Sequence, residues 1–113
     1  MPLKALVVAG GLLWPACAFS QAQDSGSFVS GNDLYEKCNS ESGTVSHGIC
    51  GGYITGIADL LNNAGKLCIP HQMVTVRQLL DIVVKYLREH PEERNISASL
   101  LVVLALHDSF PCK

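Results

Sequence analysis

Hydrophobic residues recur every three to four positions over four segments of the chain, which is the spacing of amphipathic α-helices. The pattern is clearest over residues 76–89, where apolar positions follow the i, i+3, i+4, i+7 rule without a miss. They are Val76, Leu79, Leu80, Val83, Val84 and Leu87. Ile82 and Tyr86 widen this apolar stripe to about half of the helix circumference. We therefore expect either two helices of the same chain or a second chain to pack on it.

Capping residues mark the start of this helix and of a shorter one earlier in the chain. Thr75 and Gln78 have the spacing of a capping box, in which each side chain bonds the backbone N–H of the other residue. Ser30 and Asp33 have the same spacing at the start of a helix predicted over residues 30–38. The sequence therefore predicts capping-box hydrogen bonds at the N-termini of both helices.

Another helix is predicted over residues 48–64 and ends at Gly65, because glycine commonly stops helices at this position. Residues 39–47 before it are polar and are expected to form a loop. Its apolar side is expected to carry Ile49, Tyr53, Ile57, Leu60, Leu61 and Ala64. Gly52 and Gly56 lie at the edge of that side, where another helix could approach closely, and we expect ordinary packing within the core there.

The last helix is predicted over residues 97–109. Its middle, residues 100–106, is apolar on all sides, so we expect it at the centre of the bundle. That run is too short to cross a membrane, which takes about 20 apolar residues. His90-Pro91 ends the preceding helix, and residues 92–95 form a charged connection. With no alternating segment long enough for a strand, the predicted fold class is all-α, a small four-helix bundle.

The chain begins with the features of a secretory signal peptide, predicted over residues 1–22. A positive charge precedes an apolar run over residues 5–15, which is too short for a membrane-spanning anchor. Small residues allow cleavage before Gln23 or before Phe19, and both sites remove Cys17. We therefore expect an exported protein that functions in an oxidising compartment.

Four cysteines remain in the domain expected over residues 23–113, and they are Cys38, Cys50, Cys68 and Cys112. An even number in a short exported chain predicts two disulfides, which staple the bundle. Three pairings are possible. We expect Cys38–Cys50, which closes the polar loop between the first two helices. We also expect Cys68–Cys112, which clasps the last two helices together.

The charge balance and the polar residues exclude several functions. The net charge is −2, and removal of Lys4 with the signal peptide takes it to −3, with no basic patch. Nucleic acids and, after signal cleavage, membranes are therefore not expected partners. The four histidines are scattered, and the cysteines lack the short spacing of zinc sites. We expect no catalytic residue, no metal and no cofactor, so the protein is predicted not to be an enzyme.

Four short motifs carry a family resemblance. They are Cys50-Gly51-Gly52-Tyr53-Ile54-x-Gly56, Cys68-Ile69-Pro70, Tyr86-Leu87-x-x-His90-Pro91-Glu92 and Ala105-Leu106-x-x-x-Phe110-Pro111-Cys112. Over residues 35–112 the chain resembles the Tai family, the type VI secretion amidase immunity proteins, and the related resistance-associated Rap proteins. The resemblance implies a periplasmic, disulfide-bonded helical immunity domain. It also implies a homodimer that binds a peptidoglycan amidase and blocks the active-site groove of that enzyme.

An inhibitor of that kind presents an anchored, projecting element to a groove, and residues 89–95 fit this description. We expect contacts with the amidase from Glu89, His90, Glu92, Glu93, Arg94 and Asn95. Glu92 and Glu93 are expected to be exposed and to meet a basic rim or the catalytic histidine of the amidase. The homodimer is expected to use Ile82 and Tyr86. A plain solvated turn is the alternative for residues 89–95, and the polar face of the 76–89 helix is the next candidate.

Two other functions fit a small exported helical domain. One is a periplasmic acid-stress chaperone, whose dimer opens at low pH and needs many carboxylates or histidines at the interface. Only residues 89–95 offer such a cluster. The other is a small secreted enzyme, which the scattered polar residues favour least. Capture of periplasmic partners with and without an amidase distinguishes these functions from immunity.

Overall fold

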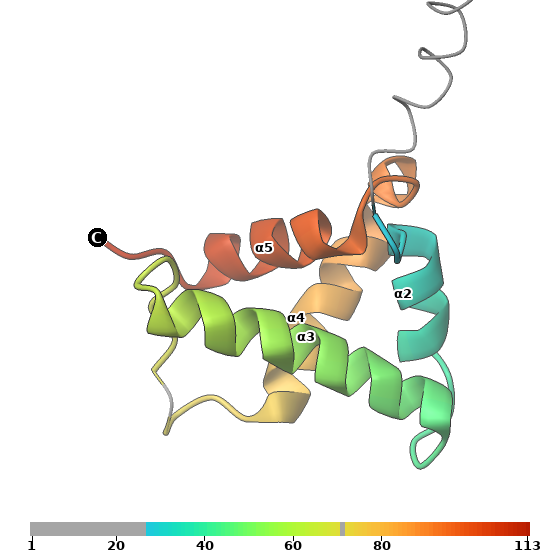
Figure 1. Ribbon diagram of the computed structural model, residues 1–113, viewed down its shortest axis with the longest axis horizontal. Coiled ribbons are helices and arrows are strands. Elements are labelled where there is room, and N and C mark those ends of the chain that lie inside the picture. The colour runs from blue at the N-terminus through green and yellow to red at the C-terminus, as the bar shows by residue number, and fades with distance from the viewer. Residues whose placement is uncertain (1–26, 71) are drawn as a thin grey trace, which may run out of the picture.

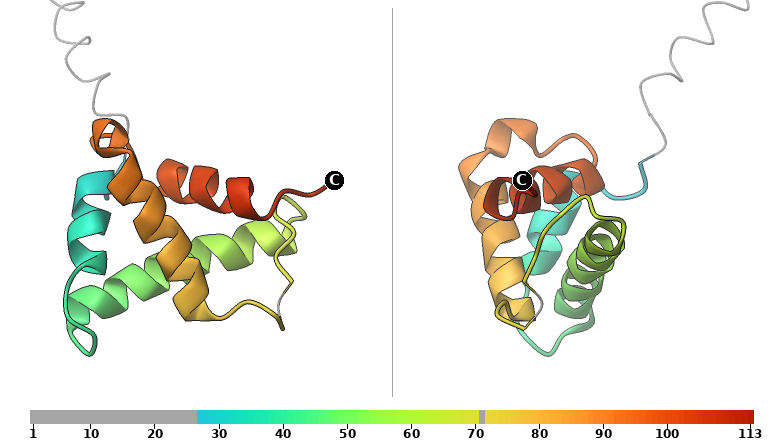
Figure 2. Two further views of the ribbon diagram at one scale, coloured as in Figure 1. Left: turned by 180° about the vertical axis from the view of Figure 1, so that it is seen from behind. Right: turned by 90° about the vertical axis from the view of Figure 1, so that its left-hand side faces the viewer.

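The computed structural model describes residues 27–70 and 72–113, which form a helical bundle (Figure 1). Its elements are α2 (Gly31–Cys38), α3 (Val45–Asn63), α4 (Val76–Glu89), the 3₁₀ turn η1 (Pro91–Glu93) and α5 (Ala98–Ser109). α3 and α5 run alongside each other, α4 crosses behind them, and α2 packs across one end (Figures 1 and 2). The expected all-α four-helix bundle is confirmed. The signal peptide predicted over residues 1–22 lies outside the described residues.

The two predicted capping boxes are both present. The Ser30 hydroxyl accepts from the backbone N–H of Asp33 at 3.1 Å, and the Asp33 carboxylate accepts from the backbone N–H of Ser30. The Thr75 hydroxyl accepts from the N–H of Gln78 at 3.1 Å, and the Gln78 side-chain oxygen accepts from the N–H of Thr75 at 2.7 Å. These bonds satisfy backbone donors that a helix start otherwise leaves without a partner.

α3 differs from the prediction in its start and in its rotation. It begins three residues earlier than expected, because Thr44 acts as the N-cap and accepts from the N–H of His47 at 3.2 Å. Its buried residues are Cys50, Ile54 and Ala58. Two residues expected on the inner side are exposed instead, with 45% of Ile49 and 68% of Leu60 accessible. The end of α3 agrees with the prediction, since Gly65 follows it with a φ of 74°.

Both expected disulfides are present. Cys38 and Cys50 join α2 to α3 with Cα atoms 5.0 Å apart, and both cysteines are buried. Cys68 and Cys112 join the connection after α3 to the C-terminal end of the chain, with Cα atoms 5.1 Å apart, and both are exposed. The N–H of Cys68 also donates to the carbonyl of Phe110 at 3.1 Å. The two staples therefore fasten opposite ends of α3.

α5 contributes most to the core, as predicted. Its buried residues are Ala98, Leu101, Val102, Ala105 and Leu106. Its apolar residues are not all buried, however, because Leu100 and Leu104 are exposed. In the part of the chain that the structure describes, no helix combines the length and the apolar character that a membrane crossing needs.

Candidate protein-binding site

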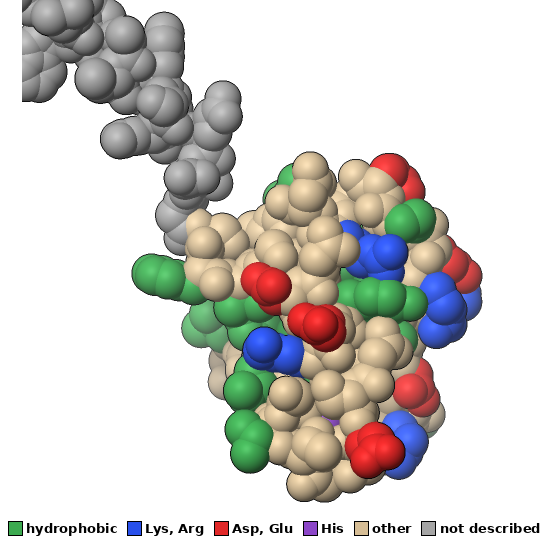
Figure 3. Space-filling model, turned by 90° about the vertical axis from the view of Figure 1, so that its right-hand side faces the viewer, with side chains coloured by type: hydrophobic (Ala, Val, Ile, Leu, Met, Phe, Trp, Pro, Cys, Tyr) green, Lys and Arg blue, Asp and Glu red, His purple; other side chains and the backbone are tan. Residues whose placement is uncertain are grey.

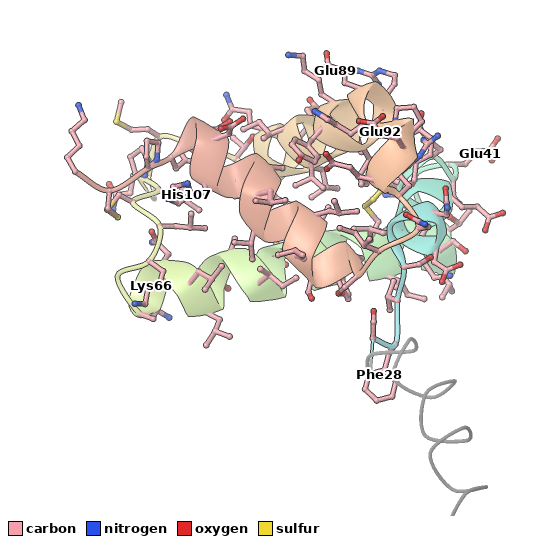
Figure 4. The ribbon with its side chains drawn as sticks, turned by 90° about the horizontal axis from the view of Figure 1, so that it is seen from above. Phe28, Glu41, Lys66, Glu89, Glu92 and His107 are labelled. Atoms are coloured by element: carbon pink, nitrogen blue, oxygen red, sulfur yellow. A yellow bond between two sulfur atoms is a disulfide. The ribbon has the colours of Figure 1, made fainter. Side chains whose placement is uncertain are left out.

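Residues 89–95 join α4 to α5 and include η1, and they form a corner of the molecule beyond the end of α4 (Figure 2). Figure 4 shows Glu89 and Glu92 on the same side of the bundle, with Phe28 on the opposite side. Figure 3 views the end of the bundle that carries both α2 and η1, and acidic, basic and apolar side chains mix on this surface. The corner formed by residues 89–95 is therefore our candidate binding site.

The backbone of this corner is fastened to the start of α2. The N–H of Asn32 donates to the carbonyl of Arg94 at 2.7 Å, and the N–H of Gly31 donates to the carbonyl of Ile96 at 2.9 Å. In the opposite direction, the N–H of Ala98, at the start of α5, donates to the carbonyl of Val29 at 2.9 Å. The first N–H groups of a helix have no partner within it, and here they bind the chain that follows η1. The segment is thus held at its base by backbone contacts.

Because Gly31 has no side chain, the start of α2 can approach Arg94 and Leu101 closely enough for these bonds to form. A Cβ atom at this position would clash with a methyl group of Leu101 and would lie 2.8 Å from the carbonyl oxygen of Arg94. Real Cβ atoms essentially never come that close to a backbone atom. Glycine is therefore required for the contact between α2, α5 and the chain after η1.

Side chains fasten the same segment to α4. The hydroxyl of Tyr86 donates to the Glu93 carboxylate at 2.9 Å, and the ring of His90 stacks on the ring of Tyr86 with centroids 4.0 Å apart. Nδ1 of His90 lies 2.8 Å from the carbonyl oxygen of Tyr86. Partial burial, and then the hydrogen bond and the charge of Glu93, raise the pKa of Tyr86 above its ordinary value of 10.0.

Arg94 connects the segment to α2. Its guanidinium carbon lies 4.1 Å from the centre of the Tyr35 ring, a cation–π arrangement. Nε of Arg94 is buried and has no hydrogen-bond partner among the described residues. Linear patterns gave no signal for Tyr35 or Gly31, because both meet a segment far along the chain.

The expected contact residues divide into two groups. Glu89, Glu92 and Asn95 are exposed, while His90, Glu93 and Arg94 are half-buried and bonded within the protein. The expectation that Glu93 is exposed is therefore wrong: the turn η1 directs its carboxylate to Tyr86. Glu89 forms an exposed ion pair with Lys85 at 3.7 Å, which contributes little to stability. Glu92 is exposed and has no bonded partner within the described residues.

Ile82 and Tyr86, the expected dimer residues, are half-buried and pack against the core. Large exposed apolar side chains lie instead mainly on α3 and α5, and they include Val45, Ile49, Leu60, Leu100 and Leu104. Gly52 and Gly56 on α3 are exposed, and a Cβ atom on either would meet no other described residue within 4 Å. The expectation that these glycines pack within the core is wrong, because α3 is rotated to direct Cys50 inward.

The histidines and carboxylates of the described residues are dispersed over several elements. Among the described residues, no group of three or more His, Cys, Asp or Glu side chains is placed to hold a metal ion. His47, His90 and His107 lie on different elements, and the fourth histidine, at position 71, lies outside the described residues. The site offers carboxylates and aromatic rings on an anchored corner, an arrangement that suits contact with a protein surface.

The fold and the site define a small, disulfide-bonded helical protein with an anchored acidic corner. Residues 30–112 match the family of Rap1a immunity proteins, so this chain belongs to that family. The match covers all four helices and both disulfides. Comparison with individual curated proteins gave no match. Membership identifies a partner class, since an immunity protein binds and neutralises a cognate effector protein.

Proposed function

We propose that this protein is a periplasmic immunity protein that binds a type VI secretion peptidoglycan amidase and blocks the active-site groove of that enzyme with residues 89–95. The single observation that carries this proposal is the anchoring of the segment. Backbone bonds to α2, the Tyr86–Glu93 bond and the Arg94–Tyr35 contact hold it in one conformation. A pre-organised element loses less conformational entropy on binding, which favours tight inhibition.

The disulfides and the family support an exported protein. Two disulfides suit an oxidising compartment such as the periplasm, where peptidoglycan lies. The signal peptide expected over residues 1–22 accounts for the export. We propose that the mature protein acts there as an inhibitor without catalytic activity of its own.

A homodimer is the second part of the proposal. Two surfaces are candidates: the stripe around Ile82 and Tyr86 on α4, and the exposed apolar residues of α3 and α5, among them Leu60 and Leu100. The second is more exposed, with 68% of Leu60 accessible. Exposed Gly52 and Gly56 also allow a close approach by another helix. The two surfaces differ in their relation to the proposed plug. Tyr86 bonds Glu93, so a dimer through the α4 stripe would compete with amidase binding, whereas the exposed apolar residues of α3 and α5 include none of residues 89–95.

The test is co-purification of residues 23–113 with type VI amidase effectors, followed by a peptidoglycan hydrolysis assay. We expect a stable complex with one amidase and loss of its activity at equimolar inhibitor. If the protein instead binds no amidase and prevents aggregation of unfolded periplasmic proteins at low pH, the chaperone function replaces this proposal.

A further inference from the structure

A hollow of about 210 Å³ lies between the C-terminal turns of α4 and α5. Its lining includes Ile82, Tyr86, Glu89, His90, Ala105 and Asp108. Glu89 and His90 also belong to the anchored corner, so the hollow is continuous with the candidate binding site. Neither the family match nor the proposed plug assigns it a role.

The lining has a layered chemistry. Ala105 is buried and Ile82 is half-buried, so the inner wall is aliphatic. The rings of Tyr86 and His90 stack face to face at 19° with centroids 4.0 Å apart, and this aromatic stack forms one side of the hollow. The carboxylates of Glu89 and Asp108 belong to exposed residues and lie toward the solvent. A long side chain with an apolar stem and a positive end would find a matching surface for each part.

The electrostatic environment of the hollow is negative. Glu93 accepts a 2.9 Å hydrogen bond from the Tyr86 hydroxyl, and Glu89 and Asp108 belong to the lining. Burial and then the carboxylates of Glu93, Asp108 and Glu92 raise the pKa of Tyr86. Lys85, which is part of the lining, is paired with Glu89, and both side chains are more than half exposed. An exposed pair of this kind is weak and exchanges readily with another cation. Asp108 forms no hydrogen bond or ion pair within the described part of the chain.

We infer that this hollow is a subsite for a lysine or arginine side chain of the partner protein. The stem of that side chain lies against Ile82 and Ala105, and its cationic end lies over the Tyr86–His90 pair and binds Asp108. Arginine suits the site best, because its planar guanidinium stacks on aromatic rings and binds carboxylates through two N–H groups. That the partner is an effector rests on the proposed function. The cation specificity rests on the hollow alone.

The first test uses a small probe and requires no effector. We would titrate ¹⁵N-labelled residues 23–113 with N-acetyl-arginine methylamide, and in parallel with its neutral isostere, N-acetyl-citrulline methylamide. We expect saturable amide shifts at Tyr86, His90 and Asp108 with arginine only. Asp108→Asn should weaken the response at least threefold, while Glu41→Gln, a change at an exposed carboxylate on the loop after α2, should leave it unchanged. Equal shifts with citrulline, or an unchanged response in Asp108→Asn, would overturn the inference.

The second test uses the amidase that the co-purification identifies. Asp108→Asn should weaken amidase binding at least fivefold, with a smaller effect at high salt, and Glu41→Gln should have no effect. If the amidase binds parent and Asp108→Asn equally well, the subsite is not part of the interface and the inference fails, while the proposed function stands. If no amidase binds the parent although arginine binds the hollow, the proposed function fails and the cation site stands.

Discussion

The hydroxyl of Tyr86 donates a 2.9 Å hydrogen bond to the carboxylate of Glu93, and this bond ties α4 to the turn that follows it. We expect Tyr86→Phe to lower the free energy of unfolding by about 0.5–1.5 kcal/mol, because a half-buried carboxylate loses its donor. Urea denaturation measures the change. Tyr53→Phe is the matched control, since the Tyr53 hydroxyl has no hydrogen bond within the described residues. Equal stability of Tyr86→Phe and the parent would show that the bond does not hold the segment.

The raised pKa of Tyr86 also predicts a loss of stability in alkali. The folded protein holds the phenolic proton more tightly than the unfolded chain, whose tyrosines titrate near 10.0. The contribution is therefore fully present below about pH 10 and is lost as the pH rises through the folded pKa. Urea midpoints of the parent and of Tyr86→Phe, measured at about pH 9 and about pH 11, should converge at the higher pH. A constant difference between the two proteins would contradict the assignment.

Gly31 is predicted to be the glycine least tolerant of substitution among those of the described helices. Gly31→Ala forces a Cβ atom against Arg94 and Leu101, and overpacking of this kind costs about 1–3 kcal/mol. Gly48→Ala on α3 is the matched control, because among the described residues nothing lies within 4 Å of a Cβ atom there and alanine favours a helix by about 1 kcal/mol. Thermal denaturation should show the two changes with opposite signs. A Gly31→Ala protein as stable as the parent would contradict the packing at this position.

Much of the fold could be predicted from the linear pattern, and α4 shows why. Its apolar spacing, the Thr75–Gln78 box and His90-Pro91 each act within a few residues of the chain, so both ends matched the structure. α3 was less predictable, because its rotation depends on a disulfide with another helix. An averaged apolar stripe placed Leu60 inside, whereas the Cys38–Cys50 bond directs a neighbouring face inward.

The candidate site could be located from the sequence, but its internal organisation could not. Charge and Pro91 marked residues 89–95 as a projecting connection. Which side chains of this segment are exposed and which are bonded within the protein depends on contacts with α2 and α4. Glu92 and Glu93 are adjacent and identical in type, and only the geometry of η1 decides that Glu93 bonds Tyr86 while Glu92 remains exposed.

The position of the homodimer contact can be decided by a pair of charge substitutions. We expect Leu60→Lys to shift a dimer to monomer in analytical ultracentrifugation at micromolar concentration without loss of fold, because the side chain is 68% exposed. Ile82 packs partly against the core, so Ile82→Lys is first checked for retained helicity by circular dichroism. In a folded variant it should have the same effect only if the α4 stripe forms the contact. A parent protein that is monomeric throughout this range would contradict the homodimer, and dissociation by Ile82→Lys alone would assign the contact to α4.

The central claim is that residues 89–95 plug an amidase groove, and calorimetric titration of a purified type VI amidase tests it most directly. Glu92→Ala should leave stability unchanged, because the side chain is exposed and has no bonded partner within the described residues. Loss of one member of a buried charge pair costs about 2–5 kcal/mol, so the Kd should rise by well over tenfold. Glu41→Ala, at another exposed carboxylate, should bind like the parent. If Glu92→Ala binds the amidase as tightly as the parent does, residues 89–95 are not the plug.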